Sequence, residues 1–248
     1  MKAIGVSVNY LKVKQFVWQH VLLLCSLFVM TMGVVLCLKS AIGSSTISSI
    51  PYVMTLSGEI GRVPALSVGT YTILMNCLLV GLQIAVLRRR FELMQLFQLV
   101  VGFLFGWFID LNMWLMSGLY CDMWASQAVC QLLGCTILGL GIAFEVKCGS
   151  VTMPGEGISM ALSLVSGKPF SKVKIMVDSA LVVIAVALGY LFFGKWMGEV
   201  IGIGTLFAMV YVGLVVKIVA PRISWFDRVV TTPGFRRYIF GLLRKFRS

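Results

Sequence analysis

Residues 17–38 read VWQHVLLLCSLFVMTMGVVLCL and contain no Asp, Glu, Lys or Arg. A helix needs about 20 mainly apolar residues to cross the hydrocarbon core of a bilayer, so this stretch is long enough to span a membrane. Five further apolar runs follow, at 67–87, 93–117, 123–146, 172–193 and 198–220. The sequence therefore predicts a bundle of six transmembrane helices.

The composition supports a membrane protein. Hydrophobic residues make up 59% of the chain and charged residues 12%, with a mean hydropathy of +0.98, whereas soluble domains average about 45–50% apolar and about 25% charged residues. These values exclude a soluble globule, a disordered chain and a secreted disulfide scaffold. Because the apolar runs are unbroken and do not alternate with polar residues, they favour helices over a β-barrel.

The first run has an alternative reading as a cleaved signal peptide. Its apolar stretch is longer than a signal peptide requires, and Lys39-Ser40-Ala41 is a poor cleavage site. We therefore expect a retained helix. Cysteines predict no disulfide, because Cys121 alone of the seven falls in an expected external loop.

The basic residues predict the orientation of the bundle. With the N-terminus inside, 18 of the 21 Lys and Arg residues fall in cytoplasmic segments, and only Lys39, Arg62 and Lys195 fall outside. Lys and Arg accumulate in cytoplasmic loops, so both termini are expected in the cytoplasm. The net charge of +12 does not form one continuous stripe, and we expect no nucleic-acid partner.

The last residues have the pattern of a basic amphipathic helix. Apolar residues recur at helical spacing from Phe235 to Phe246, and Arg236, Arg237, Arg244, Lys245 and Arg247 take the other side. Such a helix is expected to lie on the anionic lipids of the inner leaflet. A simple topological anchor with no specific lipid ligand is the favoured interpretation.

Self-comparison indicates a duplication. A series of residues recurs in the same order in the two halves: Gly33, Lys39, Ser57-Gly58, Pro64 and Ser67 return as Gly141, Lys147, Ser166-Gly167, Pro169 and Ser171. Each copy holds three predicted spans, so the second copy must enter the membrane from the opposite side. Inverted repeats of this kind build many secondary transporters, with the site at the repeat interface near the middle of the membrane.

Each copy also contains a segment that is too short and too polar to span. The two segments are 39–58, KSAIGSSTISSIPYVMTLSG, and 147–167, KCGSVTMPGEGISMALSLVSG. Each joins a Gly/Ser/Thr-rich stretch to a short amphipathic run. We expect both to be re-entrant, and an interfacial loop with a surface helix is the alternative. Non-helical backbone at membrane depth is tolerated where it is buried in protein or lines a cavity.

No catalytic signature is visible. Motifs of zinc hydrolases, phosphate-binding loops, nucleophile elbows and paired redox cysteines are all missing, and the single histidine, His20, lies at the end of a span. We therefore expect no enzyme activity and no cofactor or metal. Ionisable groups within apolar segments are the default functional candidates, because they are costly there. Those groups are Glu145, Asp110, Asp178 and, above all, Glu156 in the irregular Pro154-Gly155-Glu156-Gly157 segment.

Several short motifs, in this order and spacing, resemble the YitT/YczE/YyaS family of bacterial integral membrane proteins. They are Ala41-Ile42-Gly43, Ser67-Val68-Gly69-Thr70, Phe108-Ile109-Asp110, Met153-Pro154-Gly155-Glu156-Gly157 and Gly202-Ile203-Gly204-Thr205-Leu206-Phe207-Ala208. The resemblance covers about residues 26–220. It implies a protein of the bacterial cytoplasmic membrane and no assigned substrate. The chain departs from the family in lacking a proline after Gly43 and in lacking the soluble C-terminal domain of YitT-type members, which places it nearer the YczE-like branch.

The sequence thus predicts an all-α membrane protein with two inverted three-helix repeats, at 17–117 and 123–220, between an N-terminal segment 1–16 and a tail 221–248. The predicted function is transport of a small solute by alternating access, and a non-transporting assembly or regulatory factor is the alternative. Whether the chain acts as a homo-oligomer is left open. The predicted substrate-binding residues are Lys39, Ser44, Ser45, Thr46, Asn76, Asp110, Lys147, Pro154, Gly155, Glu156, Gly157 and Asp178.

Overall fold

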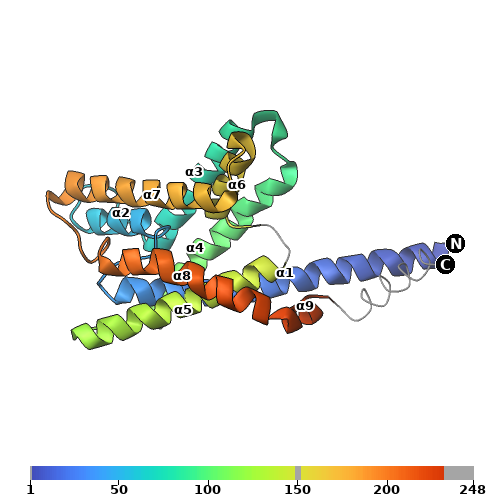
Figure 1. Ribbon diagram of the computed structural model, residues 1–248, viewed down its shortest axis with the longest axis horizontal. Coiled ribbons are helices and arrows are strands. Elements are labelled where there is room, and N and C mark those ends of the chain that lie inside the picture. The colour runs from blue at the N-terminus through green and yellow to red at the C-terminus, as the bar shows by residue number, and fades with distance from the viewer. Residues whose placement is uncertain (1, 149–151, 232–248) are drawn as a thin grey trace.

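The computed structural model describes residues 2–148 and 152–231, and the regular elements in these residues are all helices (Figure 1). The helices are α1 Lys2–Lys39, α2 Ser49–Glu59, α3 Val68–Leu87, α4 Phe97–Leu115, α5 Trp124–Cys148, α6 Pro154–Ser166, α7 Phe170–Phe193, α8 Ile203–Arg222 and α9 Ser224–Val230. Two 3₁₀ turns, Arg88–Arg90 and Leu93–Leu96, connect α3 to α4.

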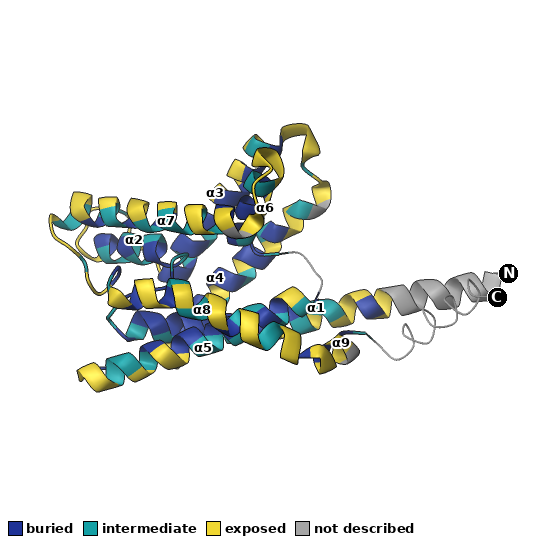
Figure 2. Cartoon of the chain, in the orientation of Figure 1, coloured by how far each residue is buried: buried dark blue, intermediate teal, exposed yellow. Residues whose placement is uncertain are grey.

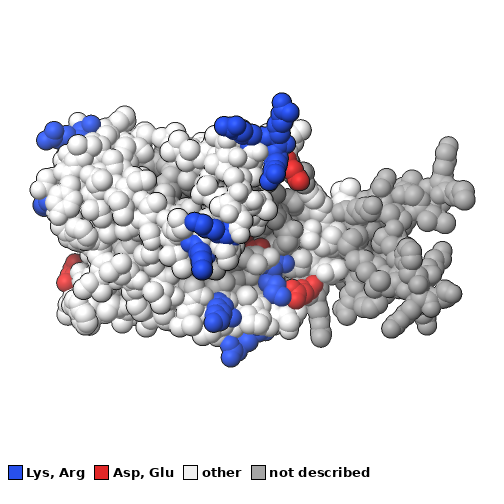
Figure 3. All heavy atoms as spheres, turned by 45° about the horizontal axis from the view of Figure 1, so that its top comes forward, with Lys and Arg blue, Asp and Glu red and all other residues white. Residues whose placement is uncertain are grey.

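Six helices of the described part are long and apolar enough to cross a membrane. These candidate spans are Val13–Lys39, Val68–Arg90, Phe97–Leu115, Trp124–Cys148, Lys172–Phe193 and Ile203–Arg222. They correspond to the six predicted runs, so the structure supports a multi-pass membrane protein. A broad uncharged surface separates groups of basic side chains on the face shown in Figure 3.

Helix α1 is longer than the sequence predicts. The apolar run begins at residue 17, but the helix starts at Lys2 and comprises 38 residues. At 1.5 Å per residue this is about 57 Å, well beyond the ~30 Å hydrocarbon core. No proline interrupts residues 2–16, so nothing in the local sequence ends the helix at the membrane surface. In Figure 1 its N-terminal part extends beyond the bundle.

The core of the bundle is the antiparallel crossing of α1 and α5. Met30 lies against Gly141 and Cys37 against Gly134, so the two helices run in opposite directions. A Cβ atom on Gly33 would lie 2.4 Å from the Leu138 backbone nitrogen. Small residues at such crossings let helix backbones approach closely, and here they allow a close contact between the two halves of the chain.

The short helices α2 and α6 are inserted among the long ones. Helix α2 packs between α3 and α7, and so does α6. Their N-terminal ends approach each other, since a Cβ atom on Gly155 would lie 3.0 Å from the Ile47 side chain. Ile47, Ile50, Ile158 and Leu162 share one apolar cluster with Met75 and Leu79 of α3 and Val177 and Leu181 of α7. The N-terminal ends of both short helices therefore lie near the middle of two spans.

Helices α3 and α4 pack tightly, whereas α7 and α8 barely touch. Gly69 and Gly106 face each other so closely that a Cβ atom on Gly106 would lie 2.5 Å from the Gly69 carbonyl oxygen. Only 17% of the residues in the α7 span and 22% in the α8 span are buried, compared with 39–56% in the other four. Exposed residues accordingly cover much of α7 and α8 in Figure 2.

A short helix that the sequence did not predict follows the last span. Helix α9 packs on α5 and α1 through Phe226 and Val230, which contact a cluster containing Phe144. The Gln15 side chain donates a hydrogen bond of 2.7 Å to the Val230 carbonyl. This helix therefore fastens the end of the last span to the first. The predicted amphipathic helix at 235–247 lies outside the described residues.

Candidate functional site

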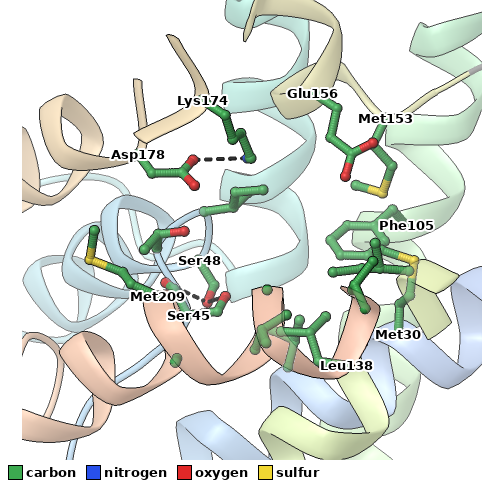
Figure 4. A pocket seen from close by; sticks show the side chains of 18 of the residues that line it. Met30, Ser45, Ser48, Phe105, Leu138, Met153, Glu156, Lys174, Asp178 and Met209 are labelled. Atoms are coloured by element: carbon green, nitrogen blue, oxygen red, sulfur yellow. Dashed lines mark hydrogen bonds and ion pairs between the residues drawn. The ribbon is translucent and has the colours of Figure 1, made fainter. Parts of the chain in front are cut away.

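A cavity of about 540 Å³ lies inside the bundle (Figure 4). Its lining comes from α1, α3, α4, α5, α6, α7 and α8 and from the segment 45–48 that precedes α2. Ligand pockets in proteins typically measure roughly 300–1,000 Å³, so the cavity has the size of a small organic molecule. Four of the predicted site residues, Ser45, Thr46, Glu156 and Asp178, line it.

One wall of the cavity is polar and carries three ionisable groups. Lys174 Nζ lies 2.9 Å from Asp178 Oδ1, and these two residues are one turn apart on α7. Glu156 projects from α6 beside them (Figure 4). The Glu156 carboxylate makes no hydrogen bond or ion pair with any described residue. Lys174 and Asp178 act on its charge with opposite signs.

The opposite wall is apolar. Met30 of α1, Phe105 of α4 and Leu138 of α5 belong to one buried cluster and line the cavity together, while Met153 of the same cluster lies beside Glu156 (Figure 4). Helix α8 adds Ala208, Met209, Val212, Gly213 and Val216. The cavity is thus amphipathic, with charge on one side and hydrocarbon on the other.

The local sequence places Glu156 in the first turn of α6. Met153 caps this helix and Pro154 occupies its first position, where proline is favoured because its missing N–H needs no partner there. The Gln83 side chain of α3 donates a hydrogen bond of 3.1 Å to the Pro154 carbonyl. Gly157 allows this contact, since a Cβ atom there would lie 2.5 Å from Gln98 Oε1 and 2.7 Å from Gln83 Oε1.

A second carboxylate lies behind Glu156. Glu145 of α5 is only 4% exposed, and its Oε1 accepts a hydrogen bond of 3.1 Å from the Met153 backbone N–H. Its Oε2 is buried with no partner in the described part of the chain. Glu145 and Glu156 are close enough for negative charges on them to repel each other, so two carboxyl groups lie at the polar wall of the cavity.

The serine-rich segment before α2 is fixed by the loop between α7 and α8. The Ser44 backbone N–H and its hydroxyl group both donate to the Val200 carbonyl at 2.9 Å. Gly43 has φ +141° and lies against Thr205, where a Cβ atom would be 2.4 Å from the backbone nitrogen. Ser44 therefore positions the segment and does not line the cavity, while its neighbours Ser45 and Thr46 do.

Two predicted residues lie in the contact between α3 and α4. The Asp110 carboxylate of α4 accepts hydrogen bonds from the Ser67 hydroxyl at 2.6 Å and from the Gly69 N–H at 2.8 Å. It thus holds the N-terminus of α3. Asn76 is buried and donates to the Gly102 carbonyl at 3.2 Å, and its Oδ1 has no partner among the described residues.

The two predicted lysines lie away from the cavity. Lys39 Nζ is 5.7 Å from the centroid of the Tyr120 ring. Lys147 Nζ forms an ion pair of 2.9 Å with Asp227 of α9. Lys174 is not among the predicted site residues, although its spacing of four residues from Asp178 within an apolar run is the pattern of an intrahelical ion pair.

The site shows no arrangement typical of a metal centre. Groups of three or more His, Cys, Asp or Glu side chains that could hold a metal ion do not occur in residues 2–148 and 152–231. The cavity is suited to binding a small molecule, because it combines sufficient volume with charged groups on one wall and an apolar surface on another.

A family model matches residues 17–221, and its description is a family of unknown function, DUF6198. The match covers most of the chain, so the protein belongs to this family. No curated protein and no solved structure matches the chain.

Proposed function

We propose that this protein is a carrier of a small organic solute, and that the cavity beside Glu156 is its binding site. The observation that carries the proposal is the position of the cavity. It lies where the N-terminal ends of the two short helices approach each other, and both halves of the chain contribute to its lining. Interrupted helices that meet near mid-membrane form the substrate sites of many secondary transporters.

The two halves are proposed to be inverted repeats with re-entrant short helices. The contacts support this pairing. Helix α2 packs on α7 as α6 packs on α3, and α1 packs on α4 as α5 packs on α8. Exchanging the halves turns each of these four contacts into its counterpart and turns the antiparallel α1–α5 crossing into itself.

Alternating access follows if the two halves exchange conformations. In the described state α3 and α4 are closed together and α7 and α8 are apart, so the cavity opens between the latter. The opposite state would separate α3 from α4 and close α7 on α8. The solute would then meet the other side of the membrane.

The setting of this carrier is also proposed. The 18-to-3 distribution of basic residues supports cytoplasmic termini, and the resemblance to the YitT/YczE/YyaS family supports a bacterial cytoplasmic membrane. We propose anionic inner-leaflet lipids as partners of the tail and no catalytic activity. A non-transporting assembly factor is the alternative, and it requires no access from both sides.

Accessibility of the cavity from the two sides of the membrane tests the proposal. The seven native cysteines, all free thiols, are first replaced, and Thr46→Cys is introduced. A membrane-impermeant maleimide is then added to right-side-out and to inside-out vesicles. A carrier exposes Thr46→Cys to both sides in turn. Labelling from one side alone would favour the alternative, and cysteines at Arg62 and Arg89, outside the cavity, report the integrity of the vesicles.

A further inference from the structure

We propose that the solute is an amphipathic organic cation and that it enters the cavity from the bilayer, between α7 and α8. The proposal rests on the carrier function above and names the substrate class. Three features of the cavity carry it: an unpaired carboxylate, an apolar wall opposite this carboxylate, and a mouth between two helices that face lipid.

The charge of the cavity selects a cation. Lys174 and Asp178 neutralise each other at 2.9 Å, whereas Glu156 has no hydrogen-bonding or ion-pair partner in the described residues. Glu145, buried behind Glu156, adds a second carboxyl group, which has no ion-pair partner among the described residues. A buried charge is costly unless an opposite charge pairs with it. A cationic solute supplies that partner, and an anionic solute would be repelled.

The shape of the cavity selects an amphipathic molecule over a small inorganic ion. Only one wall carries charge, and Met30, Phe105 and Leu138 face it across the cavity (Figure 4). A metal ion or a small ammonium ion would leave the apolar wall in contact with water. An organic body that covers this wall gains the favourable burial of apolar surface, and the Phe105 ring adds an aromatic face of the kind that attracts organic cations.

The cavity opens on the outside of the bundle between two candidate membrane spans, α7 and α8. Ile175 of α7 lines the cavity and is 62% exposed. Gly213 of α8 also lines it, and no atom lies within 4 Å of the place where its Cβ would be. Since α7 and α8 barely touch, the proposed opening between them faces the lipid along its length and one aqueous side at its end, so Thr46 stays within reach of an impermeant reagent. An amphipathic cation concentrates in the membrane, so this path would take the solute from where it is most abundant.

A pair of ions with the same shape and opposite charge tests the substrate class. Radiolabelled tetraphenylphosphonium and tetraphenylborate are equilibrated with the full-length protein in nanodiscs, and binding to empty nanodiscs is subtracted. We expect saturable binding of the phosphonium alone. Glu156→Gln should weaken it about tenfold or more, while Lys174→Gln, which removes the one Lys or Arg among the described residues that line the cavity, should strengthen it. Glu59→Gln, at an exposed position on α2, is the matched control and should bind as the wild type does.

The possible results separate the substrate class from the carrier function. Equal binding of both ions, or full binding by Glu156→Gln, would overturn the choice of a cation. Gly213→Phe places a ring in the mouth and should slow phosphonium binding, and unchanged kinetics would overturn entry between α7 and α8. If neither ion binds but Thr46→Cys is labelled from both sides, the substrate class is wrong and the carrier stands. If Thr46→Cys is labelled from one side alone, the carrier proposal fails.

Discussion

The α3–α4 and α7–α8 pairs occupy corresponding places in the two halves of the chain, yet one pair is closed and the other is open. The residues of α4 that face α3 include Gly102 and Gly106, whereas α8 presents larger residues such as Ala208 and Val212 to the cavity. Close glycine contacts thus accompany the packed α3–α4 interface, and the described glycines of α8 make no such close contact with α7.

The polar groups of the two pairs differ in the same direction. Asp110 accepts hydrogen bonds from Ser67 and Gly69 across the α3–α4 contact, whereas the described residues of α7 and α8 form no hydrogen bond with each other. The ionisable groups of α7 pair within their own helix, as Lys174 does with Asp178. Cross-helix hydrogen bonds are therefore available to one pair and unavailable to the other.

The comparison requires that the two halves of the chain have opposite orientations in the membrane, and cysteine labelling tests this requirement. Single cysteines are placed at Arg62 and Lys195 and, separately, at Arg89 and Lys168. The charge distribution predicts complete labelling of the first two by an impermeant reagent added outside intact cells and no labelling of the last two. Labelling at Arg89 or Lys168 in intact cells would end the comparison, and permeabilised cells serve as the positive control.

A larger side chain inserted into the contact between α3 and α4 should have the largest effect on stability. In Gly106→Leu the new side chain meets the Gly69 carbonyl at a contact distance that cannot be accommodated. Overpacking of this kind costs about 1–3 kcal/mol, which lowers the melting temperature by about 2–4 °C per kcal/mol. The measurement is thermal denaturation in detergent. Gly81→Leu, on the same pair but with open space around it, should melt close to the wild type, and equal losses in both variants would refute the packing argument.

Asp110→Asn should have a smaller effect. The amide keeps one acceptor oxygen for the Gly69 N–H but replaces the acceptor that faces the Ser67 hydroxyl by an NH₂ donor and removes the negative charge, so both hydrogen bonds are weakened, at a cost of about 1 kcal/mol. Hydrogen exchange should accelerate in the first turn of α3 and remain unchanged in α7. Asp122→Asn, at an exposed loop position, controls for the loss of a charge. Unchanged exchange in α3 would mean that the carboxylate does not hold the pair together.

The smallest effect is expected on the open side. Gly213→Leu adds a side chain where no neighbouring atom lies within 4 Å, and leucine is the better helix former by up to about 1 kcal/mol. The variant should melt at or slightly above the wild-type temperature. A marked loss of stability would show that α7 and α8 spend most of their time packed together.

The transmembrane helices could be predicted from the sequence, but their relative packing could not. Apolar runs near 20 residues fix the spans, because lipid enforces helices of that length. The position of Glu156 among the site residues followed from its irregular, glycine-flanked surroundings. In contrast, Asp110 and Asn76 share the same apolar environment in the sequence, and only the contacts reveal that their polar groups serve the α3–α4 seam.

The position of Lys174 in the cavity wall could not be predicted from the sequence. As a lysine near the start of a span it has the features of a topology signal, and the sequence alone does not tell that it turns towards the cavity. Its ion pair with Asp178 follows from spacing, but its place beside Glu156 depends on how α6 and α7 pack. Likewise the N-terminal extension of α1 carried no periodic pattern strong enough to predict a helix before residue 17.

That extension gives the molecule a long lever arm. From the tight crossing at Gly33 to the helix start at Lys2 there are 31 residues of continuous helix, or about 46 Å. A rigid rod of this length that tilts by about 10° at the crossing moves its far end by about 8 Å. A spectroscopic label near the start of α1 would therefore amplify small rearrangements of the buried crossing into distances that are easily measured outside the membrane.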